Sequence, residues 1–166
     1  MSDIKLKEEI AIFPLHGTIL LPGSVLPLHI FEPRYRKMVD HVTENGDLLI
    51  GIIQPKAQDS NKLCKIGCVG SIEHSQKLPK GNYLIQLHGE SRFQIVEEID
   101  TDTPFRQARV AYSLFPNDLG SSKPTYLRMN ARTFKKEWSR YLLIKKTQAE
   151  KFSGIIDLRL PYIALI

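Results

Sequence analysis

Residues 20–42 combine two periodicities that restrict how this chain folds. They read LLPGSVLPLHIFEPRYRKMVDHV. In the first half, three apolar side chains share one face of an extended strand: Leu26, Leu28 and Ile30. Pro33 then suits the first turn of a helix, where its missing N–H is not needed. Apolar residues follow at helical spacing: Tyr35, Met38, Val39 and Val42. The stretch therefore predicts a strand over 25–31 that leads into a helix packed beside it.

Most of the other apolar runs in the first 115 residues have the character of strands. They lie at 10–15, 47–54, 63–78, 83–99 and 105–115. Gly89 interrupts the fourth run, which predicts a bulge or bend in one long strand. Phe93 beyond it keeps the odd-numbered parity of Ile85, so both are expected on one face. Pro27 cannot donate to a sheet ladder, which places its strand at an edge or at a bulge.

Charge is distributed unevenly along the chain of 166 residues, whose net charge is +5. Residues 121–166 hold 10 of the 23 Lys and Arg and 3 of the 18 Asp and Glu, so they contribute +7 and the rest contributes −2. Apolar side chains in this basic part share one helical face: Leu127, Ala131, Phe134, Trp138, Tyr141 and Leu142. We therefore expect a β domain over 1–118 and a C-terminal helical segment over 119–166.

The two ends of the chain carry different signals. The N-terminal sequence MSDIKLKEEIAIF has both charge signs and no long apolar run, so we expect no secretory signal. No run approaches the roughly 20 apolar residues that cross a bilayer. We expect a cytoplasmic protein without a membrane partner. The C-terminal sequence LPYIALI leaves two interpretations open: it packs onto the body of the protein, or the chain is a truncated form of a longer one.

The sequence lacks the motifs of common catalytic sites. It contains no P-loop, no G-x-G-x-x-G, no G-x-S-x-G and no H-E-x-x-H. Cys64 and Cys68 would lie roughly 13 Å apart in one strand, too far for a disulfide. A second cysteine pair that would complete a zinc site is missing. We therefore predict that the chain is not an enzyme and that it uses neither cofactor nor metal.

Three ordered blocks resemble one known family. FPLHGTILLPGSVLPLHIFEPRYRKMV (13–39), IGCVGSIEHSQKLPKGNYLIQLHGESRFQI (66–95) and PFRQARV (104–110) resemble the N-terminal, substrate-binding domain of Lon proteases, and above all its small free-standing bacterial members. The resemblance implies an α+β, mainly β fold: a PUA-like pseudobarrel with one inserted helix, followed by a helical bundle. In Lon proteases this domain precedes an ATPase module and a protease module, and this chain is too short to hold either.

The resemblance implies a non-catalytic module that binds unfolded or exposed polypeptide segments. An apolar loop tip would contact such a ligand through three residues: Leu20, Leu21 and Pro22. A cleft lined by arginines would contribute three more: Arg34, Arg36 and Arg92.

A structural interpretation of the same motifs stays open beside the functional one. Glu32 and Arg34 then hold the strand–helix junction, Arg92 meets a carboxylate, and the loop that contains Leu20 folds onto the barrel. Four other motif residues have structural roles in this interpretation: Pro33, Tyr35, Gly89 and Phe93.

RNA binding is the alternative function. PUA-like folds include RNA binders, and the C-terminal helices are basic, so phosphate contacts would make affinity fall steeply with salt. Against this, the β part is slightly acidic, and Phe134 and Trp138 belong to the apolar helix face, which leaves few aromatic rings to stack on bases. A small ligand or a substrate in a barrel cleft is a third hypothesis, supported only by the general concavity of barrels.

Overall fold

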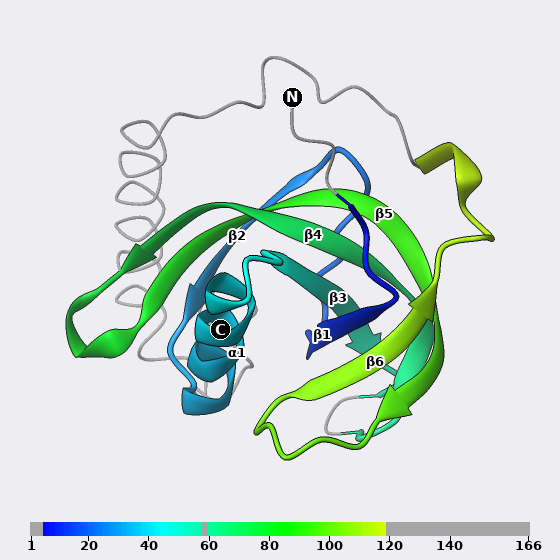
Figure 1. The fold of residues 1–166 in the computed structure, drawn as a ribbon. Helices are drawn as coiled ribbons and strands as arrows, with labels where there is room; N and C mark the ends of the chain where they lie inside the picture. Colours follow the sequence, from blue (N-terminus) through cyan, green and yellow to red (C-terminus); the bar gives the residue numbers. More distant parts are fainter. Residues whose placement is uncertain (1–4, 58–59, 119–166) are drawn as a thin grey trace, which may run out of the picture. The chain divides into compact units, whose positions relative to one another are not determined.

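The structure is a computed structural model that describes residues 5–57 and 60–118. This part of the chain contains six strands and one α-helix (Figure 1). The strands are β1 (Glu9–Pro14), β2 (Val25–Ile30), β3 (Leu49–Pro55), β4 (Leu63–Lys77), β5 (Tyr83–Ile99) and β6 (Arg106–Ala111). The helix α1 (Pro33–Glu44) lies between β2 and β3, and two short 3-10 turns are η1 (Pro79–Gly81) and η2 (Pro116–Asp118). The mainly β character with one inserted helix is confirmed.

The C-terminal helices predicted over 119–166 lie outside the described residues. Within the described part, α1 is too short and too polar to cross a membrane. The last strand was expected over 105–115 but ends at Ala111. The chain turns there, because the Phe115 N–H donates to the Tyr112 carbonyl oxygen at 2.9 Å and η2 follows.

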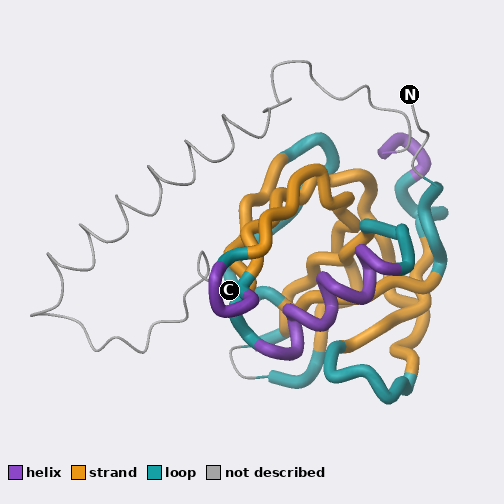
Figure 2. The backbone as a smooth tube through the Cα atoms, turned by 60° about the vertical axis from the view of Figure 1, so that its left-hand side comes forward, coloured by secondary structure: helices purple, strands orange, loops and turns teal. Residues whose placement is uncertain are grey.

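The strands form one mixed sheet that closes on itself. Their order is β2-β5-β4-β3-β1-β6, and β6 also pairs with β5, so five strands make a ring and β2 extends the sheet from β5. Figure 2 shows the strand trace curving back on itself, with the long helix α1 alongside it. Closure depends on the length of β5, which spans 17 residues. One edge of β5 pairs with β4. On the other edge, the first half of β5 pairs with β2 over Tyr83–His88 and the second half pairs with β6 over Gln94–Ile99. As predicted for Pro27, β2 is an edge strand among the described strands.

Gly89 marks the predicted bulge, but its consequence differs from the expectation. Val69 pairs with Ser91 and Gly70 with Gly89, so Glu90 is an extra residue in β5. One extra residue moves every later side chain to the opposite face. Phe93 therefore lies on the face opposite Ile85, and the expectation of a shared face is wrong.

Two hydrophobic cores follow from this change of face. The helix-side core lies between α1, β2 and the outer face of the ring, and the four apolar residues predicted on α1 all belong to it. The ring core contains side chains from all five ring strands, with Phe93 fully buried among them. The aromatic ring of Phe93 lies against backbone, since a Cβ added at Gly67 would be 2.5 Å from its Cζ.

Replacement of Phe93 tests this account of the ring core. We expect Phe93→Ala to lower the free energy of unfolding by about 3–5 kcal/mol, because it leaves a cavity that strand backbones cannot close. Denaturant titration measures the loss. Val96→Ala, in the same strand but at a side chain 62% exposed, is the control and should change stability by less than about 0.5 kcal/mol. Equal losses in the two variants would contradict the assignment of the ring core.

Candidate functional site

The segment between β1 and β2 presents apolar side chains to solvent. We call residues 16–24 the apolar loop. Its side chains alternate, with Thr18 and Leu20 buried and Ile19 and Leu21 exposed at 70% and 55%. The inward side chain of Leu20 belongs to the helix-side core. The loop therefore displays two large aliphatic groups, while Thr18 and Leu20 point inward and attach it to the domain.

Hydrogen bonds fix the shape of the apolar loop. The Ser24 hydroxyl accepts from the Leu21 N–H at 3.0 Å and donates to the Leu21 carbonyl oxygen at 2.7 Å. The Gln54 side-chain amide donates to the Thr18 carbonyl oxygen at 3.2 Å. A loop held in this way loses little conformational entropy when a ligand covers it.

Gly89 brings the apolar loop into direct contact with β5. The Gly23 N–H donates to the Gly89 carbonyl oxygen and the Gly89 N–H donates to the Ser24 carbonyl oxygen, each at 2.8 Å. A Cβ at Gly89 would lie 2.1 Å from the Leu21 carbonyl oxygen, a distance that no side chain can occupy. Glycine is therefore required here by the close approach of two backbones.

The predicted loop tip is only partly exposed. Leu21 is exposed and Pro22 is half-buried, whereas Leu20 packs into the core. The expectation that the loop folds onto the domain holds for Leu20, while contact of Leu21 and Pro22 with a polypeptide stays a prediction. Ile19, the most exposed large apolar side chain of the described residues, was missed. The signal was present, because alternation in an extended segment places Ile19 on the same side as Leu21 when Leu20 points inward.

Arg34 and Arg36 contact different parts of the domain. The Arg34 Nε donates to Glu32 at 2.9 Å, and its guanidinium lies 4.5 Å from the centre of the Tyr35 ring. The Arg36 Nη1 donates to the Lys80 carbonyl oxygen at 2.8 Å, which joins α1 to η1. The contact of Arg34 with Glu32 agrees with the structural interpretation of the strand–helix junction. A cleft lined by the arginines stays a prediction.

Arg92 forms a paired contact with Asp118. Its Nε and Nη2 donate to the two carboxylate oxygens at 2.8 and 2.9 Å, and its backbone N–H donates to the same carboxylate at 2.9 Å. This N–H lies between the parts of β5 that pair with β2 and β6. The guanidinium holds the pKa of the Asp118 carboxyl below its usual value. The pair therefore closes a gap in the sheet and holds the chain after β6.

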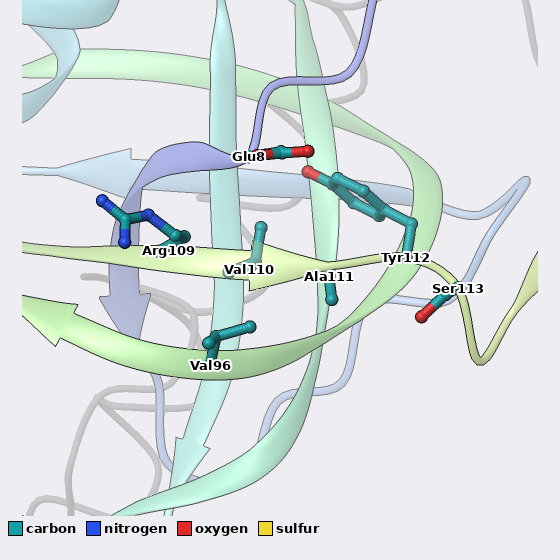
Figure 3. A pocket seen from close by; sticks show the side chains of 7 residues that line it. All are labelled: Glu8, Val96, Arg109, Val110, Ala111, Tyr112 and Ser113. Carbon is teal, nitrogen blue, oxygen red and sulfur yellow. The ribbon is translucent and has the colours of Figure 1, made fainter.

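A pocket lies beside the end of β6 (Figure 3). Its volume is about 380 Å³, and it is lined by Glu8, Val96, Arg109, Val110, Ala111, Tyr112 and Ser113. Val96 is an extra residue in β5, because Ile95 pairs with Val110 and Glu97 pairs with Arg109. Glu9 and Glu97 both accept from the Arg109 guanidinium, which balances its charge. The lining includes no histidine, cysteine or lysine.

The two cysteines of β4 differ in burial, since Cys64 is half-buried and Cys68 is buried. Cys64 and Cys68 are free thiols, and burial raises the pKa of Cys68 to about 12, so this thiol is protonated and unreactive near neutral pH. No group of three or more potential metal ligands occurs within residues 5–57 and 60–118.

Comparison with known proteins shows to which protein family this chain belongs. The fold is that of a mainly β domain, and the family model described as "ATP-dependent protease La (LON) substrate-binding domain" matches residues 9–156. Because this match covers most of the sequence, the chain belongs to the Lon substrate-binding domain family.

Individual relatives agree with this assignment. The chain is similar to a Lon protease of Flavobacterium johnsoniae (29% identity, covering 66% of this chain and 14% of the relative) and to one of Cytophaga hutchinsonii (33% identity, covering 63% and 14%). It thus spans about one seventh of these curated relatives. A Lon N-terminal domain protein of Xanthomonas campestris has a similar structure, with a TM-score of 0.53 and 25% identity over 63% of this chain and 59% of that one.

Replacement of Gly89 tests how the apolar loop is held. We expect Gly89→Ala to lower the free energy of unfolding by about 2–3 kcal/mol, because the added methyl group collides with backbone that must shift. Gly46→Ala is the control, since a Cβ there meets no atom within 4 Å and only its positive φ is unfavourable, by about 1 kcal/mol. Urea unfolding of both variants gives the comparison. If Gly89→Ala is as mild as its control, the loop is not held against β5 as described.

The Arg92–Asp118 pair predicts that the free energy of unfolding falls as the pH is lowered. A carboxyl whose pKa is lower in the folded state stabilises the fold above its unfolded pKa of about 4, and this contribution disappears as pH falls through the folded pKa. We therefore expect Asp118→Asn to lose less stability than the wild type between neutral pH and about pH 2. Thermal unfolding across this range measures the difference. Parallel pH profiles for the two proteins would contradict it.

Proposed function

We propose that this chain is a non-catalytic module that binds unfolded or exposed segments of other polypeptides. The observation that carries the proposal is the apolar loop, which displays Ile19 and Leu21 from a backbone held by Ser24 and Gly89. Unfolded polypeptides offer apolar side chains that folded proteins bury. Membership of a family described as substrate-binding supports the same class of ligand.

In this proposal the chain recognises polypeptides and neither hydrolyses ATP nor cleaves peptide bonds. Its sequence contains no P-loop, and its match to Lon proteases is confined to 14% of the two relatives described above. We infer that the ring is a PUA-like pseudobarrel and that affinity comes from apolar burial and backbone pairing. Bond cleavage plays no part in this function.

Binding to a denatured model protein tests the proposal. We expect the purified chain to bind a reduced, unfolded polypeptide and to leave it intact with or without ATP. Ile19→Ser combined with Leu21→Ser should weaken binding roughly tenfold to thirtyfold, since each half-exposed side chain contributes about 1 kcal/mol when covered. Fluorescence anisotropy gives the dissociation constants, and gel electrophoresis detects cleavage.

Val96→Ser is the matched control, because Val96 is an equally exposed aliphatic residue outside the apolar loop. It should bind as tightly as the wild type. Loss of binding in this control, or wild-type binding by the double variant, would exclude the apolar loop as the site. Cleavage of the polypeptide by a pure preparation would exclude a non-catalytic role.

RNA binding is the second candidate, and the +7 charge of residues 121–166 favours it. The same anisotropy measurement with single-stranded RNA decides between the two. Affinity for RNA that exceeds affinity for unfolded polypeptide and falls steeply with salt would replace the first proposal by the second.

A further inference from the structure

The outer edge of β2 has no strand partner among the described residues. β2 stands at the end of the sheet order and pairs only with β5 there. An unpaired edge exposes a row of backbone N–H and C=O groups, which another extended chain can bind. The chemistry of such an edge selects an extended polypeptide over other classes of ligand.

The register shows which backbone groups face outward. Val25 pairs with His88, so Ser24 lies opposite Gly89, whose N–H donates to the Ser24 carbonyl oxygen at 2.8 Å. Alternate residues of an antiparallel strand direct their groups to alternate edges. The residues that face β5 are therefore Leu26, Leu28 and Ile30. The residues that face the outer edge are Val25, Pro27 and His29.

Pro27 occupies a position where it disturbs no bond to β5. Because its backbone faces outward, its missing N–H leaves a gap in the outer edge only. Val25 and His29 provide N–H groups on either side of this gap, and all three outward residues provide carbonyl oxygens. A strand added at this edge would make its bonds near Val25 and His29, which are roughly 13 Å apart along β2.

β2 has only part of the usual protection of an edge strand. Charged side chains, proline, short length and bulges normally hinder the pairing of edges, and β2 is short and contains Pro27 but has neither charge nor bulge. The part of β4 beyond Ser71 that pairs with β5 alone among the described strands has both a charge and a bulge, since it contains Glu73 and Lys77 and a register shift between Ile72 and His74. β2 reads VLPLHI, with no Asp, Glu, Lys or Arg and no register shift against β5. Burial lowers the pKa of His29, which keeps its ring neutral near pH 7.

Apolar side chains lie at both ends of this edge. The apolar loop with Leu21 immediately precedes β2, and Phe31, which is 42% exposed, follows it. An extended ligand along β2 would pass from one to the other and could cover both.

We propose that the outer edge of β2 binds the extended polypeptide as an added β-strand, through the backbone of Val25 and His29, with Pro27 excluding a bond between them. This inference rests on the proposed function for the class of ligand and adds the mode of binding. Side chains of the apolar loop then contribute affinity, while backbone pairing fixes the direction and extended shape of the ligand.

Two backbone-methylated peptides test the mode of binding. The probe is a labelled ten-residue peptide with alternating apolar and polar residues, so that a slip by one residue would expose its apolar face. One derivative carries N-methyl groups on its apolar residues, and the other carries them on its polar residues. Because alternate residues direct their N–H groups to opposite edges of the peptide strand, each derivative lacks the N–H groups of one edge. We expect one derivative to bind at least tenfold more weakly than the other.

The outcomes separate this inference from the proposed function. If the unmodified peptide and an unfolded protein both fail to bind, the proposed function fails. If the unmodified peptide binds and both derivatives bind equally, whether tightly or weakly, edge pairing is overturned while polypeptide binding stands.

A pair of variants locates the edge. His29→Pro removes an outward N–H without removing a bond to β5, so binding should fall at least tenfold. His29→Ala keeps the N–H and removes the ring, so binding should stay within about twofold of the wild type if the backbone is responsible. Equal effects of the two substitutions would overturn the role of this N–H.

Amide hydrogen exchange in the full chain gives a readout that needs no variant. In the free protein, the amides of Val25 and His29 should exchange faster than that of Leu28, and saturating peptide should slow them at least tenfold. Protection of Val25 and His29 equal to that of Leu28 without peptide would show that the edge is already covered and would overturn the proposal.

Discussion

The pairing of β5 with three other strands is the constraint on which the described structure depends. One edge of β5 pairs with β4 along most of its length, and the other edge pairs first with β2 and then with β6. β5 therefore both closes the ring and pairs with β2, the strand outside the ring. The extra residue Glu90 falls between these two parts. It moves the inward side chains from the helix-side core to the ring core, so both cores depend on this irregularity.

Gly89 shows why fold and candidate site cannot be separated in this domain. The change of strand partner leaves room for a loop to approach β5, and only a residue without a side chain permits the distance observed. The apolar loop uses that space, which is why Ile19 and Leu21 stand outward on a fixed backbone. Backbone hydrogen bonds to Gly89 thus hold the apolar loop against β5.

The sequence predicted the features that depend on residues close together in the chain. It missed features that depend on residues far apart in the chain. The strand–helix junction at Pro33 and the edge position of Pro27 follow from nearby residues, and the structure agrees with both. The face of Phe93 was wrong because an alternating pattern does not reveal which residue near a bulge is the extra one. The carboxylate partner of Arg92 was expected, but its identity as Asp118 depends on ring closure across 26 residues. The pocket beside Val96 was not predicted, since distant segments form it.

The contact between Arg92 and Asp118 also determines which solution conditions weaken the attachment of the segment after β6. Three hydrogen bonds fix the last described residue to the middle of β5, the strand with the most partners. Acid protonates the Asp118 carboxylate and concentrated salt screens the charged pair, so both conditions weaken the attachment of the segment after β6 to the middle of β5.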